Sequence, residues 1–132
     1  MLSPQQELPL SEYSSLYDIV VPQDNLLRRI NDLVDFTFVY QELANSRIPI
    51  RMFKYLLLKT IYDISDVDVV ERSRYDMSFK YFLGMAPEED VINASSLCKF
   101  RKLRLEDMDL MNLLIQKSVE IAIEKGIIKS RT

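Results

Sequence analysis

The sequence contains no histidine, so a catalytic triad or a Cys–His pair that depends on an imidazole cannot form within this chain. Its one cysteine, Cys98, excludes an internal disulfide and a cysteine-based zinc finger. Its two glycines, Gly84 and Gly126, lie far apart, whereas a phosphate-binding glycine loop needs glycines close together. These absences argue against most enzyme classes.

Long apolar runs are also missing. No stretch reaches the roughly 18 apolar residues that a membrane-spanning helix needs. The first fifteen residues, MLSPQQELPLSEYSS, lack the basic start and the apolar core of a signal peptide. We therefore expect no membrane partner, and a cytoplasmic protein, with which the single cysteine is consistent.

The residues that are abundant favour helices. A length of 132 residues suits one domain, and 48% hydrophobic with 28% charged residues is ordinary for a globular protein. Leucine, isoleucine, methionine, glutamate, lysine and arginine are plentiful, and all are compatible with helices. Scarce glycine is unfavourable for the many turns of an all-β protein. The composition predicts an all-α fold of about six helices in a compact bundle.

The periodicity of apolar residues divides the chain into three parts. Residues 1–21 show no sustained period and are predicted to be an extended or partly disordered arm. Residues 22–126 form the predicted helical domain, and residues 127–132 form a short β-prone fragment after it. Within the domain, apolar spacing predicts helices over residues 25–39, 50–62, 66–75, 77–83, 96–103 and 106–125.

Two of these predicted helices could form a helix-turn-helix pair. Pro49 suits the first turn of helix 50–62, and Ser65 with Asp68 predicts a capping box for helix 66–75. The break between them at Asp63 and Ile64 is short, as in DNA-binding helix-turn-helix motifs. Many helical hairpins without a DNA-binding role share this pattern, so both interpretations stay open.

Two further regions suggest packing more than ligand binding. The aromatic residues of helix 77–83 have helical spacing beside other apolar helices, which favours a place in the core over base stacking. Helix 106–125 carries Leu110, Leu113 and Ile121 outside its main apolar stripe. Such a wide apolar surface predicts burial on more than one side and a contact with another domain or chain.

Positive charge is concentrated in residues 93–105, NASSLCKFRKLRL, which hold four bases and no acid although the whole chain has a net charge of −3. At 100° per residue, the apolar Leu97, Phe100 and Leu103 share one face of the predicted helix. The opposite face carries Ser95, Cys98, Lys99, Arg101 and Lys102, with Arg104 at the border. This pattern predicts a helix docked through its apolar face that presents cations to a polyanion.

A second basic segment lies at residues 47–59, where Arg47, Arg51, Lys54 and Lys59 occur without an acid. The pattern places Arg51 and Lys54 opposite an apolar stripe. Both basic segments are candidates for phosphate contact, and solvated helix faces without a ligand are the alternative.

Several strings in order resemble the N-terminal domain of bacterial insertion-sequence transposases of the DDE, RNase H-like class, the InsH-like N-terminal family. They are VPQDNLLRRINDLVDFTFVY, RMFKYLLLKTIYDIS, VVERSRYDMSFKYFLGM, NASSLCKFRKLRL and IEKGIIKSRT, and the resemblance spans about residues 20–132. The chain departs from the family at Asp63, where glycine is common. It also has residues 92–94, Ile-Asn-Ala, for Pro-Asp-His, and residues 46–49, Ser-Arg-Ile-Pro, for Gly-Arg-Pro.

The resemblance implies a DNA-binding domain that helps recognise the terminal repeats of a mobile element as double-stranded DNA. The DNA contacts expected on this basis are Lys99, Arg101, Lys102, Arg104, Ser95, Ser96, Arg47, Arg51 and Lys54. The catalytic carboxylates and their divalent metal ions are expected in a separate domain of the same polypeptide. The resemblance implies that residues 127–132 are the start of the linker to that domain. The chain itself is then expected to be non-catalytic, without a cofactor, and to act in a bacterial cytoplasm. The alternative is a protein–protein module that dimerises or docks the catalytic domain.

Overall fold

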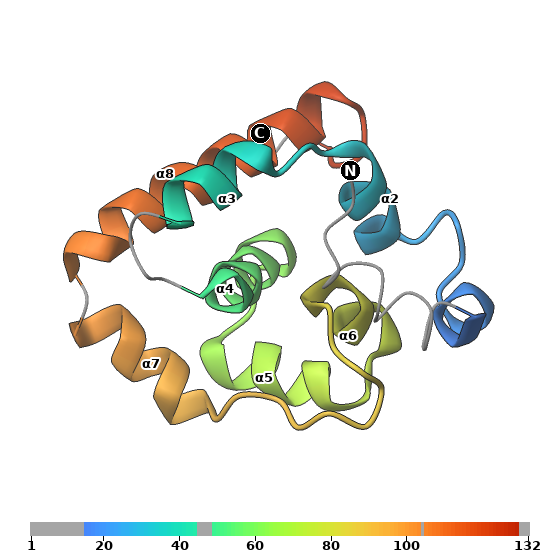
Figure 1. Ribbon diagram of the computed structural model, residues 1–132, viewed down its shortest axis with the longest axis horizontal. Coiled ribbons are helices and arrows are strands. Elements are labelled where there is room, and N and C mark those ends of the chain that lie inside the picture. The colour runs from blue at the N-terminus through green and yellow to red at the C-terminus, as the bar shows by residue number, and fades with distance from the viewer. Residues whose placement is uncertain (1–14, 45–48, 104, 130–132) are drawn as a thin grey trace.

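The computed structural model describes residues 15–44, 49–103 and 105–129. In these ranges the chain forms helices joined by turns and loops, and it forms no strand (Figure 1). A short helical segment over residues 15–20 is followed by seven longer elements. These are α2 (Leu26–Leu33), α3 (Thr37–Ala44), α4 (Ile50–Tyr62), α5 (Asp66–Tyr75), α6 (Met77–Leu83), α7 (Ala94–Leu103) and α8 (Leu105–Glu124). The predicted all-α class is confirmed, with more helical elements than the six expected.

Helix α4 forms the centre of the bundle and packs against α5, α6 and α8 (Figure 1). Five of its side chains are buried, and four of them follow one another directly: Phe53, Tyr55, Leu56, Leu57 and Leu58. Consecutive helical residues point in different directions, so a helix buried at four successive positions must be covered on several sides. The long helix α8 covers one side of α4, and α5 and α6 cover another.

The single helix predicted for residues 25–39 is wrong, because the chain breaks it into α2 and α3. Asn25 caps α2 by accepting bonds from the N–H groups of Leu27 and Arg28, at 2.9 and 3.2 Å. The helix stops at Val34, which is extended and buried like Phe36 two residues later. A continuous helix would turn these two side chains to opposite sides, whereas an extended link lets both face the core.

The predicted short turn between α4 and α5 is present, with the Ser65 half of the predicted capping box. Asp63 ends α4 in the left-handed region, at φ 54° and ψ 54°, a conformation that aspartate tolerates better than most residues. The Ser65 side chain then accepts a bond of 3.0 Å from the Asp68 N–H and begins α5.

The aromatic helix α6 lies in the core, as its spacing predicts, with Phe79 and Phe82 fully buried. Asp76 begins α6 by accepting bonds from the N–H groups of Ser78 and Phe79. Gly84 ends the helix at φ 73°, where a left-handed residue is needed.

At both ends, the described chain continues the packed structure beyond the predicted helical domain of residues 22–126. Residues 15–20 are helical, and within this segment Tyr17 is buried and its hydroxyl donates to the Met85 carbonyl oxygen. Arg28 in α2 also holds this segment, by donating a 2.9 Å bond to the Tyr17 carbonyl oxygen. Beyond α8, Gly126 turns the chain at φ 73° and Ile127 returns to the core. The remainder of the expected arm, residues 1–14, and the last three residues lie outside the described structure.

Candidate nucleic-acid interface

The basic helix α7 starts two residues earlier than its sequence suggests. The side-chain oxygen of Asn93 accepts a bond of 2.8 Å from the Ser95 N–H and a bond of 2.6 Å from the Ser95 hydroxyl. Asparagine is a strong helix-capping residue, so the helix begins at Ala94. Since the Ser95 hydroxyl proton is used by Asn93, this hydroxyl offers a ligand acceptor lone pairs and no proton.

One face of α7 is docked on the bundle, as predicted. Leu97 is fully buried and Phe100 is 8% exposed. The helix packs against α5 on one side and α8 on the other. The side chain of Leu103, the third predicted anchor, lies outside the described part.

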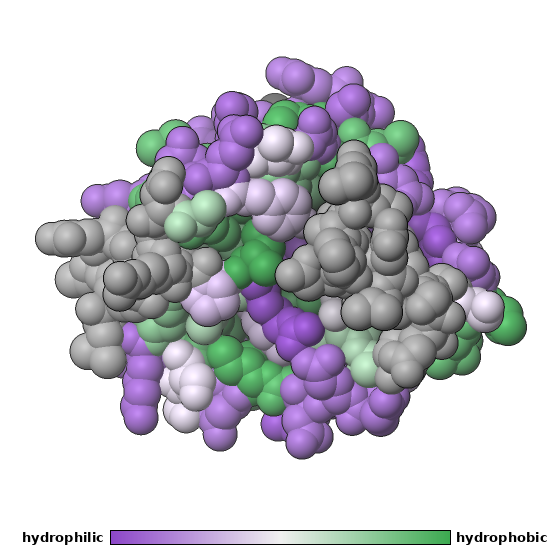
Figure 2. Space-filling view, viewed as in Figure 1, coloured by the Kyte–Doolittle hydropathy of each residue, from purple (hydrophilic) through white to green (hydrophobic). Residues whose placement is uncertain are grey.

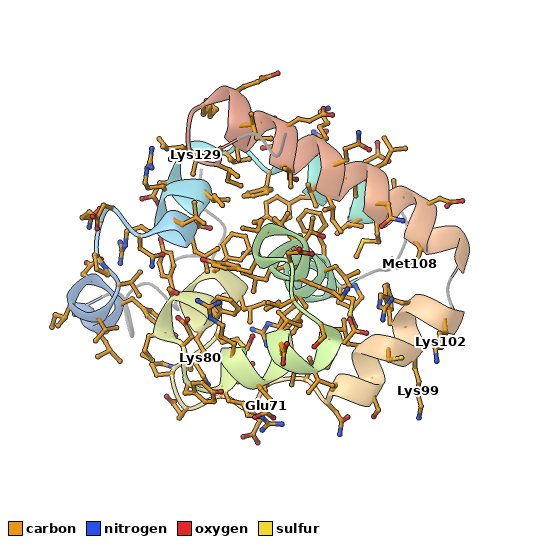
Figure 3. The ribbon with its side chains drawn as sticks, turned by 180° about the vertical axis from the view of Figure 1, so that it is seen from behind. Glu71, Lys80, Lys99, Lys102, Met108 and Lys129 are labelled. Carbon is orange, nitrogen blue, oxygen red and sulfur yellow. The ribbon has the colours of Figure 1, made fainter. Side chains whose placement is uncertain are left out.

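The opposite face of α7 presents two lysines to solvent. Lys99 and Lys102 are exposed and project away from the body of the molecule (Figure 3). Ser95, Lys99 and Lys102 follow each other at four and three residues, so they lie along one stripe. Among the residues that the structure describes, no acidic side chain forms an ion pair with either lysine. Both ammonium groups are thus available to an anion.

Arg101 does not belong to this exposed face, which corrects the sequence-based assignment. It lies four residues after Leu97, close to one full turn, and therefore on the docked side of the helix. Its guanidinium pairs with the carboxylate of Asp66 in the first turn of α5. These two residues are 35 positions apart, so no local spacing in the sequence indicates their contact.

Two of the three basic residues of α4 also occupy other places than expected. Lys54 donates a bond of 2.8 Å to the Phe82 carbonyl oxygen. Arg51 pairs with Glu89 and donates a bond of 3.1 Å to the Gly84 carbonyl oxygen. Both cations therefore stabilise the C-terminal end of α6, where free carbonyl groups and the helix dipole favour positive charge.

Burial has a clear effect on Lys54. The loss of solvent around its amino group, and next the charge of Arg51, lower the pKa of Lys54 to about 8 from 10.5. Lys54 is therefore engaged with the end of α6 instead of lying free on a cationic face, and Arg51 is only partly accessible. Its guanidinium side chain is 40% exposed.

Of the remaining predicted DNA contacts, one is exposed on α7 and two lie outside the described residues. Ser96 is exposed near the start of α7, beside the Ser95 stripe. Arg47 and Arg104 lie outside the described residues. The exposed polar set on α7 therefore comprises Ser95, Ser96, Lys99 and Lys102.

Helices α4 and α5 have the order and short turn of a helix-turn-helix pair, but the start of α5 is occupied. In DNA-binding motifs of this type, residues near the start of the second helix reach the bases. Here that first turn carries Asp66 and Asp68, and Asp66 is engaged by Arg101 of α7. The negative charge and the packing of α7 both oppose a recognition role for this turn, and α7 is the better-placed helix.

The surface around these helices is mainly polar. Figure 2 shows hydrophilic side chains along the margins of one face, with smaller apolar areas between them. A mostly apolar hollow of about 330 Å³ lies between the end of α4 and α8, lined by Ile61, Val119 and Ile123 among others.

In the described ranges, no group of three or more potential ligands is arranged to hold a metal ion. Nor does any described helix combine the length and apolar character needed to cross a bilayer.

An all-helical domain with a docked basic helix is one of several architectures that could serve nucleic-acid binding, so the family gives the necessary context. The model of the family described as Transposase domain (DUF772) matches residues 15–103, from the helical segment before α2 to the end of α7. The chain belongs to this transposase domain family. Comparisons with curated proteins and with solved structures gave no significant match.

Proposed function

We propose that this domain binds double-stranded DNA and helps a transposase of the DDE class recognise the terminal repeats of its element. The InsH-like resemblance and the membership in a transposase domain family support this role. The observation that carries it is the exposed pair Lys99 and Lys102 on a helix whose other face is anchored by Leu97 and Phe100. Cations on a fixed support suit contact with a phosphate backbone.

In this proposal the two lysines contact phosphates, while Ser95 and Ser96 lie near the helix start, where base contacts are common. The Ser95 hydroxyl, which donates to Asn93, would accept a bond from a base amino group. Arg101, Arg51 and Lys54 support the fold instead of contacting DNA. In the described part of α7, the proposed phosphate contacts are therefore the two lysines, without Arg101.

The test is a gel-shift titration of the full chain against element-end DNA and a scrambled duplex, each at two salt concentrations. The double variant K99Q/K102Q should weaken binding to both duplexes and lower the salt slope by roughly two, about 0.9 for each lost phosphate contact. A matched control is K125Q/K129Q, which removes the same charge from two exposed lysines beyond α8. Lys129 lies at the opposite end of the molecule from Lys99 and Lys102 (Figure 3).

Equal losses in the two double variants would show that only net charge matters, and the assignment to α7 would be abandoned. No binding by the wild-type chain to either duplex would refute the DNA-binding function altogether. Preference for element-end DNA over the scrambled duplex would support recognition of the terminal repeats.

The domain is proposed to act without catalysing strand cleavage. The DDE carboxylates and their two metal ions, which would perform in-line displacement, belong in this proposal to a separate domain. The chain incubated with element-end DNA and Mg²⁺ should therefore leave the strands intact on a denaturing gel. Specific nicking at the element ends would contradict this part of the proposal.

A further inference from the structure

Among the described residues, one ion pair joins the basic helix α7 to α5. The Arg101 guanidinium contacts one carboxylate oxygen of Asp66, and the side chains are only 35% and 12% exposed. Asp66 lies in the first turn of α5, at the positive end of the helix dipole, which attracts acidic side chains. The pair is therefore a charged contact at the interface of two helices, shielded from most of the solvent.

The pair is also incomplete. Asp66 Oδ1 and Arg101 Nε are both buried and have no hydrogen-bond partner among the described residues. If Arg101 moved to a DNA phosphate, the carboxylate of Asp66 would be left buried without any counter-charge. An uncompensated buried charge is strongly unfavourable, so Arg101 should stay with Asp66 when DNA binds.

Apolar and charged contacts hold α7 in different ways. The burial of Leu97 and Phe100 keeps one side of the helix on the bundle. A charged hydrogen bond adds a requirement for a short distance and a suitable angle. Arg101 thus supplies a directional contact on the docked side of α7, while Lys99 and Lys102 lie on the exposed side.

We propose that Asp66 and Arg101 form a positioning pair that sets the rotation of α7, so that Lys99 and Lys102 face the DNA backbone. This inference rests on the proposed DNA-binding function. Asp66 is then a positioning residue for a DNA contact that it does not touch. The competing arrangement is a direct phosphate contact by Arg101, with Asp66 as an internal competitor for the guanidinium.

The two arrangements predict opposite signs for one substitution. The variant D66N removes a negative charge from the neighbourhood of the site, so the competitor arrangement predicts tighter DNA binding. The positioning pair predicts weaker binding by D66N and by R101Q, each by at least about threefold, as expected when a coupled contact pair is broken. The charge swap D66R/R101D keeps the net charge and should restore part of the lost affinity.

Duplex binding should be measured by fluorescence anisotropy with the full chain, at two salt concentrations and below the thermal transition of each variant. Circular dichroism confirms that each variant is folded at that temperature. Tighter binding by D66N, or a charge swap that binds more weakly than both single variants, would overturn the positioning role.

Hydrogen exchange without DNA separates this inference from the proposed function. D66N and R101Q should accelerate amide exchange in residues 94–103 while leaving the central residues of α4 unchanged, and the swap should reverse the effect. If these exchange changes are seen but the wild type binds no DNA, the positioning pair is supported and the DNA-binding function is refuted. Unchanged exchange in α7 would overturn the pair whatever the DNA result.

Discussion

The amino group of Lys54 in α4 donates a 2.8 Å hydrogen bond to the carbonyl oxygen of Phe82 in the last turn of α6. The same amino group lies 5.2 Å from the centre of the Phe82 ring. One lysine therefore satisfies a free helix-end carbonyl and stacks on the ring of the same residue. Lys54 belongs to the basic segment of residues 47–59, and in the folded protein it stabilises the contact between α4 and α6.

The partly buried Lys54, whose amino group is shielded from solvent, should make the stability of the protein depend on pH above neutrality. Its folded pKa of about 8 lies below the usual 10.5, so between these values the unfolded chain binds more protons at this group. The free energy of unfolding should therefore rise with pH above about 8, by at most about 1.4 kcal/mol per pH unit. K54M should lose this rise, measured by urea unfolding between pH 7.5 and 9.5.

The control for this measurement is K59M, which removes a partly exposed lysine from the same helix. It should keep the wild-type dependence on pH. Parallel curves for wild type and K54M would contradict the assignment of the rise to Lys54.

Asp76 should stabilise the junction of α5 and α6 at neutral pH. Burial alone would raise its pKa, but hydrogen bonds from Ser78, Arg72 and the N–H of Phe79 outweigh burial and lower the pKa below 3.8. D76A should reduce the free energy of unfolding by about 1–2 kcal/mol at pH 7, because it removes a helix cap and an ion pair.

A carboxyl with a lowered folded pKa contributes its stability above the unfolded pKa and loses it as pH falls through the folded pKa. The difference between wild type and D76A should therefore shrink as pH is lowered below about 4. D90A, which removes an exposed acid from the loop before α7, should show no comparable loss at pH 7. A difference that grows in acid would refute the role of the ionised carboxylate.

Asp63 adopts a left-handed conformation at φ 54°, which glycine reaches without a steric penalty. D63G should raise the free energy of unfolding by about 0.5–1 kcal/mol, while D63A should lower it, since alanine lacks the local hydrogen bonding that helps aspartate there. Chemical denaturation of both variants tests whether the free energy of unfolding changes in these opposite directions. A loss of stability in D63G would show that the Asp63 side chain contributes more than its backbone strain costs.

The core and the exposed side of α8 should respond very differently to truncation. Phe79 is fully buried, and F79A should destabilise the domain by about 3–5 kcal/mol through the cavity it leaves. Leu113 on α8 is 67% exposed, and L113S should change stability by less than about 0.5 kcal/mol. Light scattering on L113S also tests the alternative of self-association through α8. A dimeric wild type that becomes monomeric in L113S would favour that alternative.

Local sequence signals predicted the elements whose causes are local. Helices α4 and α5 begin and end close to the predicted residues, because Ser65 and Asp63 act on their own backbone neighbours. The division of residues 25–39 into α2 and α3 was missed. Helical spacing continues across Val34, and only the burial of both Val34 and Phe36 in one core favours an extended link there.

In the candidate site, too, the features with local causes were predicted and a feature that depends on tertiary contacts was missed. The sequence correctly predicted that Leu97 and Phe100 are buried and that Lys99 and Lys102 are exposed, since these positions follow from the helical repeat. It misplaced Arg101, which lies close to one full turn after Leu97 and therefore on the docked side.

The sequence by itself determined the helical class, the principal helix ends and the two-sided character of α7, because each depends on residues within a few positions of one another. Tertiary structure decided which cations remain available to a ligand. Arg101 is held by Asp66 and Lys54 by the Phe82 carbonyl, partners distant in sequence that meet only when α4, α5, α6 and α7 pack together. Charge is a property of the sequence, but a cation's accessibility depends on the groups that folding brings beside it.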